Sequence, residues 1–187
     1  QPVLNSYWLM IHVAIIVGSY GPFTLGMILG LITLLLMILT TSKNKEKMAL
    51  NIKELTIINE MALTVGLVML TIGNFLGGMW ANESWGRYWG WDPKETWALI
   101  SIMIYAFVIH MRLIPGLRSR FGFSVASVVA FGSIMMTYFG VNFYLAGLHS
   151  YAKDDQEISI TYIAAGLISL TLISILAYRK HKKYFVK

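Results

Sequence analysis

The sequence predicts an all-α protein, a polytopic bundle of five transmembrane helices. Three observations predict this fold class: 57% of the 187 residues are apolar, only 13% are charged, and five apolar stretches are long enough to cross a bilayer. A soluble domain carries about a quarter charged residues. The alternating pattern of a membrane β-barrel is absent, and only helices satisfy their backbone polar groups within one segment in hydrocarbon. The composition excludes a soluble globule, a disordered chain and a nucleic-acid-binding protein, despite the net charge of +6.

The spans follow from the length of each apolar stretch, because a helix needs about 20 residues to cross the hydrocarbon core. They cover approximately residues 7–40, 55–79, 96–114, 122–148 and 158–178. Glycines in the first span, including Gly26 and Gly30, predict that helices approach one another closely there.

The positions of the basic residues predict the orientation. Most of the 15 lysines and arginines fall after the first span, after the third span or in the C-terminal tail. These are Lys43, Lys45, Lys47, Lys53, Arg112, Arg118, Arg120, Arg179, Lys180, Lys182, Lys183 and Lys187. The opposite side has Arg87, Lys94 and Lys153. By the positive-inside rule, the N-terminus is outside and the C-terminus is cytoplasmic.

The chain contains no cysteine, which excludes a disulfide, a thiolate metal site and a cysteine nucleophile of its own. It begins at Gln1, without an initiator Met and without a short signal-type apolar segment. We therefore expect residues 1–187 to be a single transmembrane domain, part of a longer protein or a processed product.

A tryptophan-rich segment, WANESWGRYWGWDPKETW over residues 80–97, is predicted to be an external loop. Trp80 and Trp97 fit the aromatic belt at the membrane–water interface, and we assign them to it. Three further rings exceed what such a belt needs: Trp85, Trp89 and Trp91. Exposed aromatic surface of this extent is typical of a site that meets a flat, apolar partner, and a porphyrin is the obvious candidate.

Asp92 has two interpretations. The run Asp92-Pro93-Lys94-Glu95 is a good helix start, with Asp92 as N-cap, Pro93 in the first helical position and Glu95 in the capping-box position. A role for Asp92 in a ligand site is equally compatible with the sequence, so both interpretations stand.

His12 and His149 are predicted to lie level with each other, on either side of the tryptophan segment. Counted from the inner span ends at Leu39 and Phe123, both lie about 40 Å above the inner face at about 1.5 Å per residue. Neutral imidazoles at matched height on two helices suit the two axial positions of a haem iron. The alternative is that they are two unrelated interfacial histidines.

His110 lies about 20 Å deeper than Trp97 along the third span. No second histidine of this chain reaches that level, so a haem bound there needs a ligand from another chain or from preceding sequence. Otherwise His110 bonds to its own helix or reaches to the interface, which is the simpler interpretation. His181, in the basic run RKHKKY, is predicted to be a solvated interface residue.

The run WGRYWGWDPKETWALI, residues 85–100, closely resembles the tryptophan-rich WWD signature of haem-handling membrane proteins. Its PKETWAL continuation resembles the CcsA branch, the cytochrome c synthase component of the system II biogenesis pathway. The runs LNSYWLMIHV around His12 and NFYLAGLHSYA around His149 are similar to the two histidine segments that flank this signature. The resemblance covers essentially the whole chain and suggests the carboxy-terminal part of a fused CcsBA-type synthase.

The resemblance implies a set of site residues. His12 and His149 would be the catalytic pair and would ligate the iron of haem b (heme b, iron protoporphyrin IX) at an outer site. The surrounding haem-binding residues would be Trp85, Trp89, Trp91 and Asp92. His110 would help hold the haem iron nearer the cytoplasm, paired with a histidine of a CcsB-type moiety, the amino-terminal part of a fused CcsBA.

The implied activity is that of a holocytochrome c synthase, or cytochrome c haem-lyase. Two cysteine thiols in the CxxCH segment of apocytochrome c would add across the two haem vinyl groups, while this chain positions the haem. The absence of cysteine agrees with thiols supplied by the substrate. The resemblance also implies a part in haem export, and a multi-pass protein in the lipid bilayer of the bacterial cytoplasmic (inner) membrane with its active site on the periplasmic face.

Three other function classes fit the sequence less well. A CcmC-like carrier would deliver haem to a chaperone without catalysing attachment, and the PKETWAL run argues against it. A b-type electron-transfer subunit would normally place both ligands inside the bilayer, whereas His12 and His149 are predicted to lie just outside it. A transporter for another substrate leaves the tryptophan segment unexplained.

Overall fold

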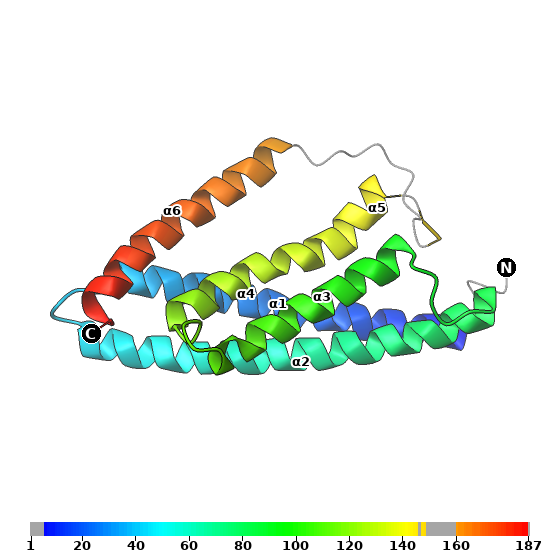
Figure 1. Cartoon of the computed structure of the whole chain (residues 1–187), viewed down its shortest axis with the longest axis horizontal. Coiled ribbons are helices and arrows are strands. Elements are labelled where there is room, and N and C mark those ends of the chain that lie inside the picture. The colour runs from blue at the N-terminus through cyan, green and yellow to red at the C-terminus, as the bar shows by residue number, and fades with distance from the viewer. Residues whose placement is uncertain (1–5, 146, 149–159, 187) are drawn as a thin grey trace.

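The computed structural model of the chain is a bundle of long helices (Figure 1). The structure describes residues 6–145, 147–148 and 160–186. Its α-helices are α1 (Tyr7–Ile38), α2 (Lys45–Trp85), α3 (Pro93–His110), α4 (Arg120–Met135), α5 (Val141–Tyr144) and α6 (Ile160–Tyr184). A 3-10 turn, η2 (Met111–Leu113), extends α3, and a π-helical segment, η3 (Met136–Gly140), joins α4 to α5.

Within the described residues, five segments are long and apolar enough to cross a membrane. They are Tyr7–Ile38, Lys45–Trp85, Pro93–Leu113, Arg120–Tyr144 and Ile160–Tyr184. The structure therefore confirms the predicted all-helical class and the predicted number of candidate spans.

The helix ends differ from the predicted span ends. Helix α2 has 41 residues, about 60 Å at about 1.5 Å per residue, or twice the roughly 30 Å hydrocarbon core. The predicted span 55–79 is only its apolar middle, because hydropathy does not detect helical turns made of polar residues. The predicted span 122–148 is too long, since the helical run ends at Tyr144 and Leu145 is extended.

Packing between α1, α2, α3 and α4 forms the main apolar core. The ring of Phe23 stacks on that of Tyr105 with their centroids 3.9 Å apart. A Cβ atom at Gly66 would lie 2.9 Å from the Phe23 ring, and one at Gly26 would lie 2.9 Å from Asn59 Oδ1. Close packing of this kind stabilises the association of membrane helices. Burial of apolar side chains does not favour association by itself, because lipid tails are as apolar as those side chains. The predicted close approach at Gly26 is confirmed.

Helix α6 is separated from α4 and α5 along much of its length and meets the bundle near its C-terminal end (Figure 1). There, Ala177 packs against Leu34, Met37 and Ile52 of α1 and α2. The preceding turns of α6 expose apolar side chains such as Leu167 and Leu172, as expected of a helix that faces lipid or another membrane helix.

His181 corrects one prediction from the sequence. Its ring stacks on Phe121 and on Phe185, with centroids 5.8 Å and 5.9 Å away, and it is only partly exposed. The basic tail predicted a solvated histidine, but stacking of an aromatic ring on two others outweighs the charge of its sequence neighbours.

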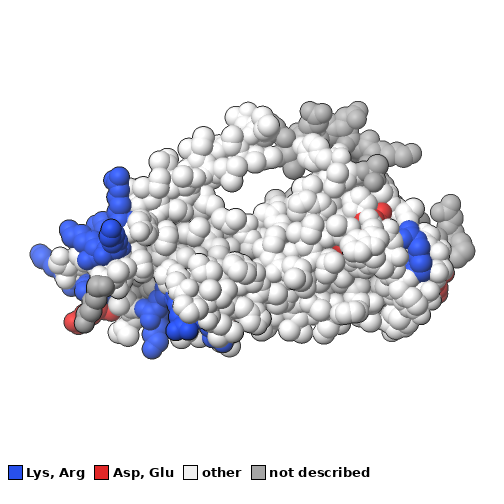
Figure 2. Space-filling view, viewed as in Figure 1, with Lys and Arg blue, Asp and Glu red and all other residues white. Residues whose placement is uncertain are grey.

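Most of the Lys and Arg side chains in view gather at one end of the bundle, and a smaller group lies at the other end (Figure 2). The end with most of these side chains holds the α1–α2 connection, the α3–α4 connection and the end of α6, because consecutive long helices run in opposite directions (Figure 1). The other end carries the end of α2 and the start of α3, where the tryptophans cluster.

Candidate functional site

A cavity of about 500 Å³ lies at the end of the bundle remote from the basic cluster. Its wall is formed by α1, the last turns of α2, the connection after α2, the start of α3, and residues of η3 and α5. Most of the wall is apolar, with a few polar side chains. This size and lining are typical of a small-molecule or cofactor site.

His12 lies in this wall, on α1, and is only 5% exposed. Its Nδ1 lies 2.7 Å from the carbonyl oxygen of Trp8. Because a carbonyl only accepts, Nδ1 carries the proton and donates, which places the lone pair of the neutral ring on Nε2. A backbone carbonyl bound to the other ring nitrogen is the usual way in which proteins orient a metal-ligating histidine.

Trp80 supports the His12 ring. The two rings are stacked, with centroids 5.2 Å apart and planes 25° apart, and Trp80 is 1% exposed. The sequence predicted an interfacial anchor at Trp80, and this prediction is wrong: α2 continues to Trp85, so Trp80 faces α1 inside the bundle. Trp97 is half-buried near the start of α3, and its assignment to the interface stays a prediction.

The connection between α2 and α3 is residues 86–92, shorter than the predicted external loop 80–97. Residues 80–85 form the last turns of α2, and 93–97 begin α3. Helix α2 stops at Gly86, whose left-handed backbone (φ 69°) is a common helix terminator.

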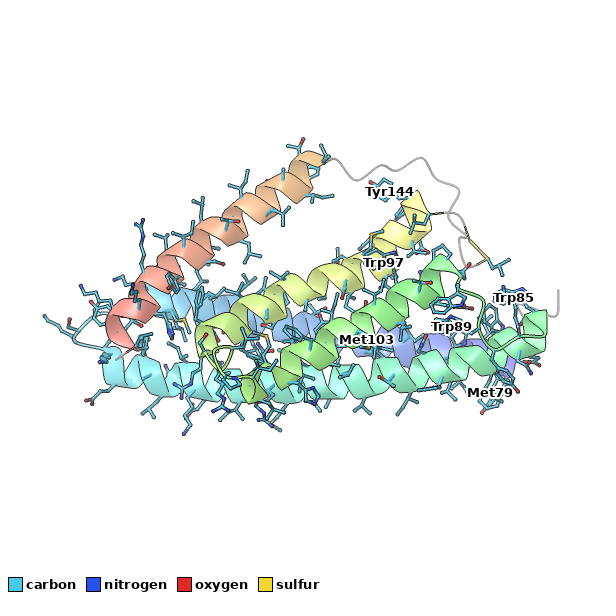
Figure 3. The ribbon with its side chains drawn as sticks, viewed as in Figure 1. Met79, Trp85, Trp89, Trp97, Met103 and Tyr144 are labelled. Carbon is cyan, nitrogen blue, oxygen red and sulfur yellow. The ribbon has the colours of Figure 1, made fainter. Side chains whose placement is uncertain are left out.

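The three tryptophans predicted to form a platform lie in different surroundings. Figure 3 shows Trp85 and Trp89 at the end of the bundle where α2 ends and α3 begins. Within the described residues, the cavity wall includes Trp89 but neither Trp85 nor Trp91. Trp85 packs edge-on against Trp80, with centroids 4.7 Å apart. Trp91 is 71% exposed and meets Trp89 edge-on at 5.7 Å.

The backbone at Trp91 is strained. Its φ of 58° is left-handed, a conformation that costs a residue other than glycine of the order of 1–3 kcal/mol. Glu95 holds this turn from both sides, since its Oε2 accepts from Gly90 N at 2.7 Å and from Asp92 N at 3.3 Å. Glu95, in the first turn of α3, thus holds the backbone on both sides of Trp91.

Asp92 forms the predicted capping box. Its Oδ2 accepts from Lys94 N at 3.0 Å, and Glu95 completes the box. The helix-cap interpretation is therefore confirmed. Asp92 also has a second contact, because its Oδ1 accepts from Leu148 N at 2.6 Å. The cap of α3 is thereby joined to the residue that precedes His149.

His149 itself lies outside the described residues, so the predicted pairing with His12 stays a prediction. His110, at the end of α3, is exposed and does not line the cavity. Its Nδ1 donates to the carbonyl oxygen of Ala106 at 2.6 Å, the same arrangement as in His12. The helix-bonding interpretation of His110 therefore has direct support.

The cavity wall includes polar residues that were not predicted from the sequence to be site residues. Lys94 Nζ donates to Asn142 Oδ1 at 2.9 Å and lies 5.9 Å from the centre of the Tyr138 ring. Two signals were available in the sequence. Tyr138 and Asn142 are polar groups four residues apart in an apolar span, and Lys94 places a cation in the first turn of a helix, where the helix dipole disfavours it.

A family model and several curated relatives match this chain. A family model described as "Cytochrome C assembly protein" matches residues 1–149. The protein NrfI of Wolinella succinogenes is 57% identical over 156 residues. Cytochrome c biogenesis proteins CcsA are 38% identical over 177 residues in Prochlorococcus marinus and 39% identical over 151 residues in Chlamydomonas reinhardtii.

The chain corresponds to only part of each relative. The alignment with NrfI covers 82% of this chain and 17% of NrfI. The alignments with the two CcsA proteins cover 80% of this chain, 55% of the Prochlorococcus protein and 42% of the Chlamydomonas protein. The chain thus spans about half the length of these CcsA relatives and a much smaller part of NrfI.

Proposed function

Because this chain belongs to the cytochrome c assembly protein family, we propose that it binds haem b at the tryptophan-bearing end of the bundle and presents it to apocytochrome c. It acts as part of a holocytochrome c synthase, with His12 and His149 as the axial ligands of the iron. The haem is the substrate that is handed on.

The observation that carries this proposal is the setting of His12. A buried imidazole lies in the wall of a mostly apolar cavity of about 500 Å³, with its Nδ1 proton on a backbone carbonyl and one face on Trp80. These contacts fix both the tautomer and the plane of the ring, which suits an imidazole that ligates through Nε2.

The second ligand, His149, is proposed from the sequence and from the resemblance. The contact between Asp92 and Leu148 supports it, because it brings the residue before His149 to the start of α3, whose Lys94 and Glu95 line the same cavity as His12. Trp89 supplies apolar wall on which a porphyrin ring packs. Trp85 and Trp91 act beside it, Trp85 behind Trp80 and Trp91 at the exposed edge.

The proposed reaction needs no group of this chain to be consumed. Each substrate thiol adds across one vinyl group: a sulfur–carbon bond forms at the inner vinyl carbon, and the thiol proton ends on the outer carbon. The chain contributes position, by holding the haem while the CxxCH segment arrives, and a water-poor wall around the ring. A histidine on each face of the iron also blocks access of oxygen.

We further propose an orientation and a partner. The basic end of the bundle faces the cytoplasm, which places the cavity at the periplasmic face of the bacterial cytoplasmic membrane. His110 then lies towards the inner face, exposed on the side of α3 and within reach of a ligand from a CcsB-type partner. This pair of histidines binds haem before it reaches the outer site.

Haem content tests the site directly. The purified wild-type protein is expected to show a haem absorption spectrum that changes on reduction with dithionite. His12→Ala and His149→Ala are each expected to lose most of this haem, while His181→Ala, which removes a histidine at the other end of the bundle, retains it. If both single variants purify with unchanged haem content and spectrum, the ligand assignment is wrong.

Covalent product separates a synthase from a CcmC-like carrier. The protein is co-expressed with a CcsB-type partner and an apocytochrome c in a host that lacks any other maturation system. A synthase gives cytochrome that keeps its haem after denaturation, and the His12→Ala variant does not. Haem-loaded protein without any covalent product supports the carrier instead.

A further inference from the structure

Lys94 is the one lysine or arginine in the cavity wall among the described residues. Its flexible four-carbon chain is long enough to carry the ammonium group out to headgroups or water, as lysines near membrane interfaces usually do. Instead, the ammonium lies on Asn142 and beside the Tyr138 ring, on the cavity side of α3.

In the described part of the chain, no carboxylate forms an ion pair with the Lys94 ammonium. The ion pair found there joins Arg112 to Glu60. The Asp92 carboxylate, two residues earlier, attracts the ammonium only at longer range, and its oxygens accept from Lys94 N and Leu148 N. The nearest acidic side chain in sequence is Glu95, and its Oε2 is bound to two backbone N–H groups of the α2–α3 connection. An ammonium group has three N–H donors, and the bond to Asn142 uses one of them.

The position of Lys94 in α3 is also unfavourable by itself. It lies two residues after the N-cap Asp92, where the positive end of the helix dipole repels a cation and attracts an anion. A negatively charged group in the cavity would be attracted both by the unused donors of the ammonium and by the start of the helix.

We propose that Lys94 binds a propionate carboxylate of the haem, with Asn142 holding the ammonium in place. This inference rests on the proposed function, since it concerns the ligand of the same cavity. Haem carries two propionates, and a carboxylate that leaves water needs a charged or hydrogen-bonding partner. The ammonium of Lys94 supplies both the charge and the unused donors.

The consequence is a defined direction of the haem in the cavity. In protoporphyrin IX, the two propionates lie on one pair of adjacent pyrrole rings, and the two vinyl groups on the other pair. A propionate held at Lys94 therefore turns the vinyl groups away from the start of α3. Axial ligands alone leave the ring able to rotate about the iron, so Lys94 is the positioning residue that fixes which edge the substrate thiols meet.

The test compares two ligands that differ only in the carboxylates: iron protoporphyrin IX and its dimethyl ester. Each is titrated into haem-depleted protein and followed by absorption. We expect the wild type to bind haem about tenfold more tightly than the diester, because a hydrogen-bonded charge pair is lost in the diester. Lys94→Gln is expected to bind haem about tenfold less tightly, and to bind the diester as the wild type does.

Two further variants sharpen the result. Lys94→Arg keeps the charge and is expected to preserve the preference for haem over the diester. Lys53→Gln removes an exposed lysine at the opposite end of the bundle and is expected to change neither affinity. Unchanged binding of the diester by Lys94→Gln also shows that this variant is folded.

The outcomes distinguish the two proposals. If Lys94→Gln prefers haem over the diester as strongly as the wild type does, while His12→Ala loses both ligands, the role of Lys94 is wrong and the haem site stands. If the wild type binds neither ligand in a manner that depends on His12, the haem site itself is wrong, and the role of Lys94 with it.

Discussion

Asp92 joins two parts of the chain that are 56 residues apart, because its Oδ1 accepts a hydrogen bond from the backbone N–H of Leu148 at 2.6 Å. The other carboxylate oxygen caps α3 through Lys94 N at 3.0 Å. One side chain thus starts the helix that carries part of the cavity wall and holds the residue before His149. The helix cap predicted for Asp92 is confirmed, and its role in a ligand site stays a prediction.

Asp92→Asn is the first test of this double role. An amide has one acceptor oxygen and one donor nitrogen, so it cannot accept from Leu148 and Lys94 on both sides as the carboxylate does. Because Asn caps a helix as well as Asp does, we expect the loss of one of the two hydrogen bonds, about 0.5–1.5 kcal/mol in the free energy of unfolding. We also expect loss of haem from the purified protein, measured by absorption.

Ser119→Ala is the matched control for Asp92→Asn. Ser119 caps α4 by accepting from Gly122 N at 2.9 Å, at the opposite end of the bundle. Its loss is expected to cost a similar amount of stability but to leave the haem content unchanged. If both variants lose haem equally, Asp92 acts through stability alone and not by holding the segment at Leu148.

Gly147→Ala tests the same contact from the other side. A Cβ atom at Gly147 would lie 2.5 Å from Asp92 Oδ1 and 2.9 Å from Pro93 Cδ, so the segment has to move away from the cap. We expect weaker haem binding with little change in the thermal stability of the helices. Retention of wild-type haem affinity in Gly147→Ala would contradict a positioning role for this contact.

Glu95→Ala is expected to release the strained turn at Trp91. Removal of the carboxylate leaves Gly90 N and Asp92 N without their shared acceptor, and Trp91 can then leave its left-handed conformation. We expect faster hydrogen exchange over residues 86–92, measured by mass spectrometry, and weaker haem binding. Glu54→Ala, an exposed change on α2, is the control. Unchanged exchange in Glu95→Ala would show that other contacts hold the turn.

The fold was largely predictable because its main signal is apolar length. A membrane helix must be long and apolar, so five such stretches predict five helices, and the structure has them. The ends were less predictable, since hydropathy does not detect the polar turns of α2 from Lys45 onwards, and the aromatic turns up to Trp85 are held by ring contacts such as that between Trp85 and Trp80. The capping box at Asp92 was predictable because it is encoded by four consecutive residues.

The site was predictable only in part, because residue type does not reveal which way a helix faces. The position of His12 towards the outer end of α1 was clear from the sequence, but its stacking on Trp80 depends on how α1 and α2 are rotated against each other. Trp85 and Trp91 lie outside the cavity wall and Lys94 lies in it, which depends in turn on how the end of α2, the connection and the start of α3 pack together. Packing between helices determines which side of each helix lines the cavity, and the apolar pattern of one helix alone does not predict it.

His110→Ala tests the proposed inner site. His110 is exposed and its ring bonds only to its own helix through Ala106 in the described part of the chain, so its loss is expected to change stability by no more than about 0.5 kcal/mol. In cells that also supply a CcsB-type partner, we expect less haem at the outer site, measured as haem per purified protein. Undiminished haem in this variant would refute a relay through His110.

Gly77→Ala tests whether the exact position of the His12 ring matters. A Cβ atom at Gly77 would lie 3.3 Å from His12 Cδ2, which is tighter than ordinary contact, and the ring is already held by Trp80 and by the carbonyl of Trp8. The ring must therefore shift by a few tenths of an ångström. We expect about tenfold weaker haem binding and a shifted absorption maximum, as for other changes beside a metal ligand.

Gly77→Ala is expected to weaken haem binding but to stabilise its helix, so the two effects can be told apart. Alanine favours a helix over glycine by about 0.5–1 kcal/mol, so Gly77→Ala is not expected to lose haem by unfolding. Gly132→Ala makes the same change on α4, where a Cβ atom meets nothing within 4 Å, and is expected to bind haem as the wild type does. If Gly77→Ala and Gly132→Ala bind haem equally well, the orientation of His12 is not what sets the affinity, and its role as an iron ligand loses its main structural support.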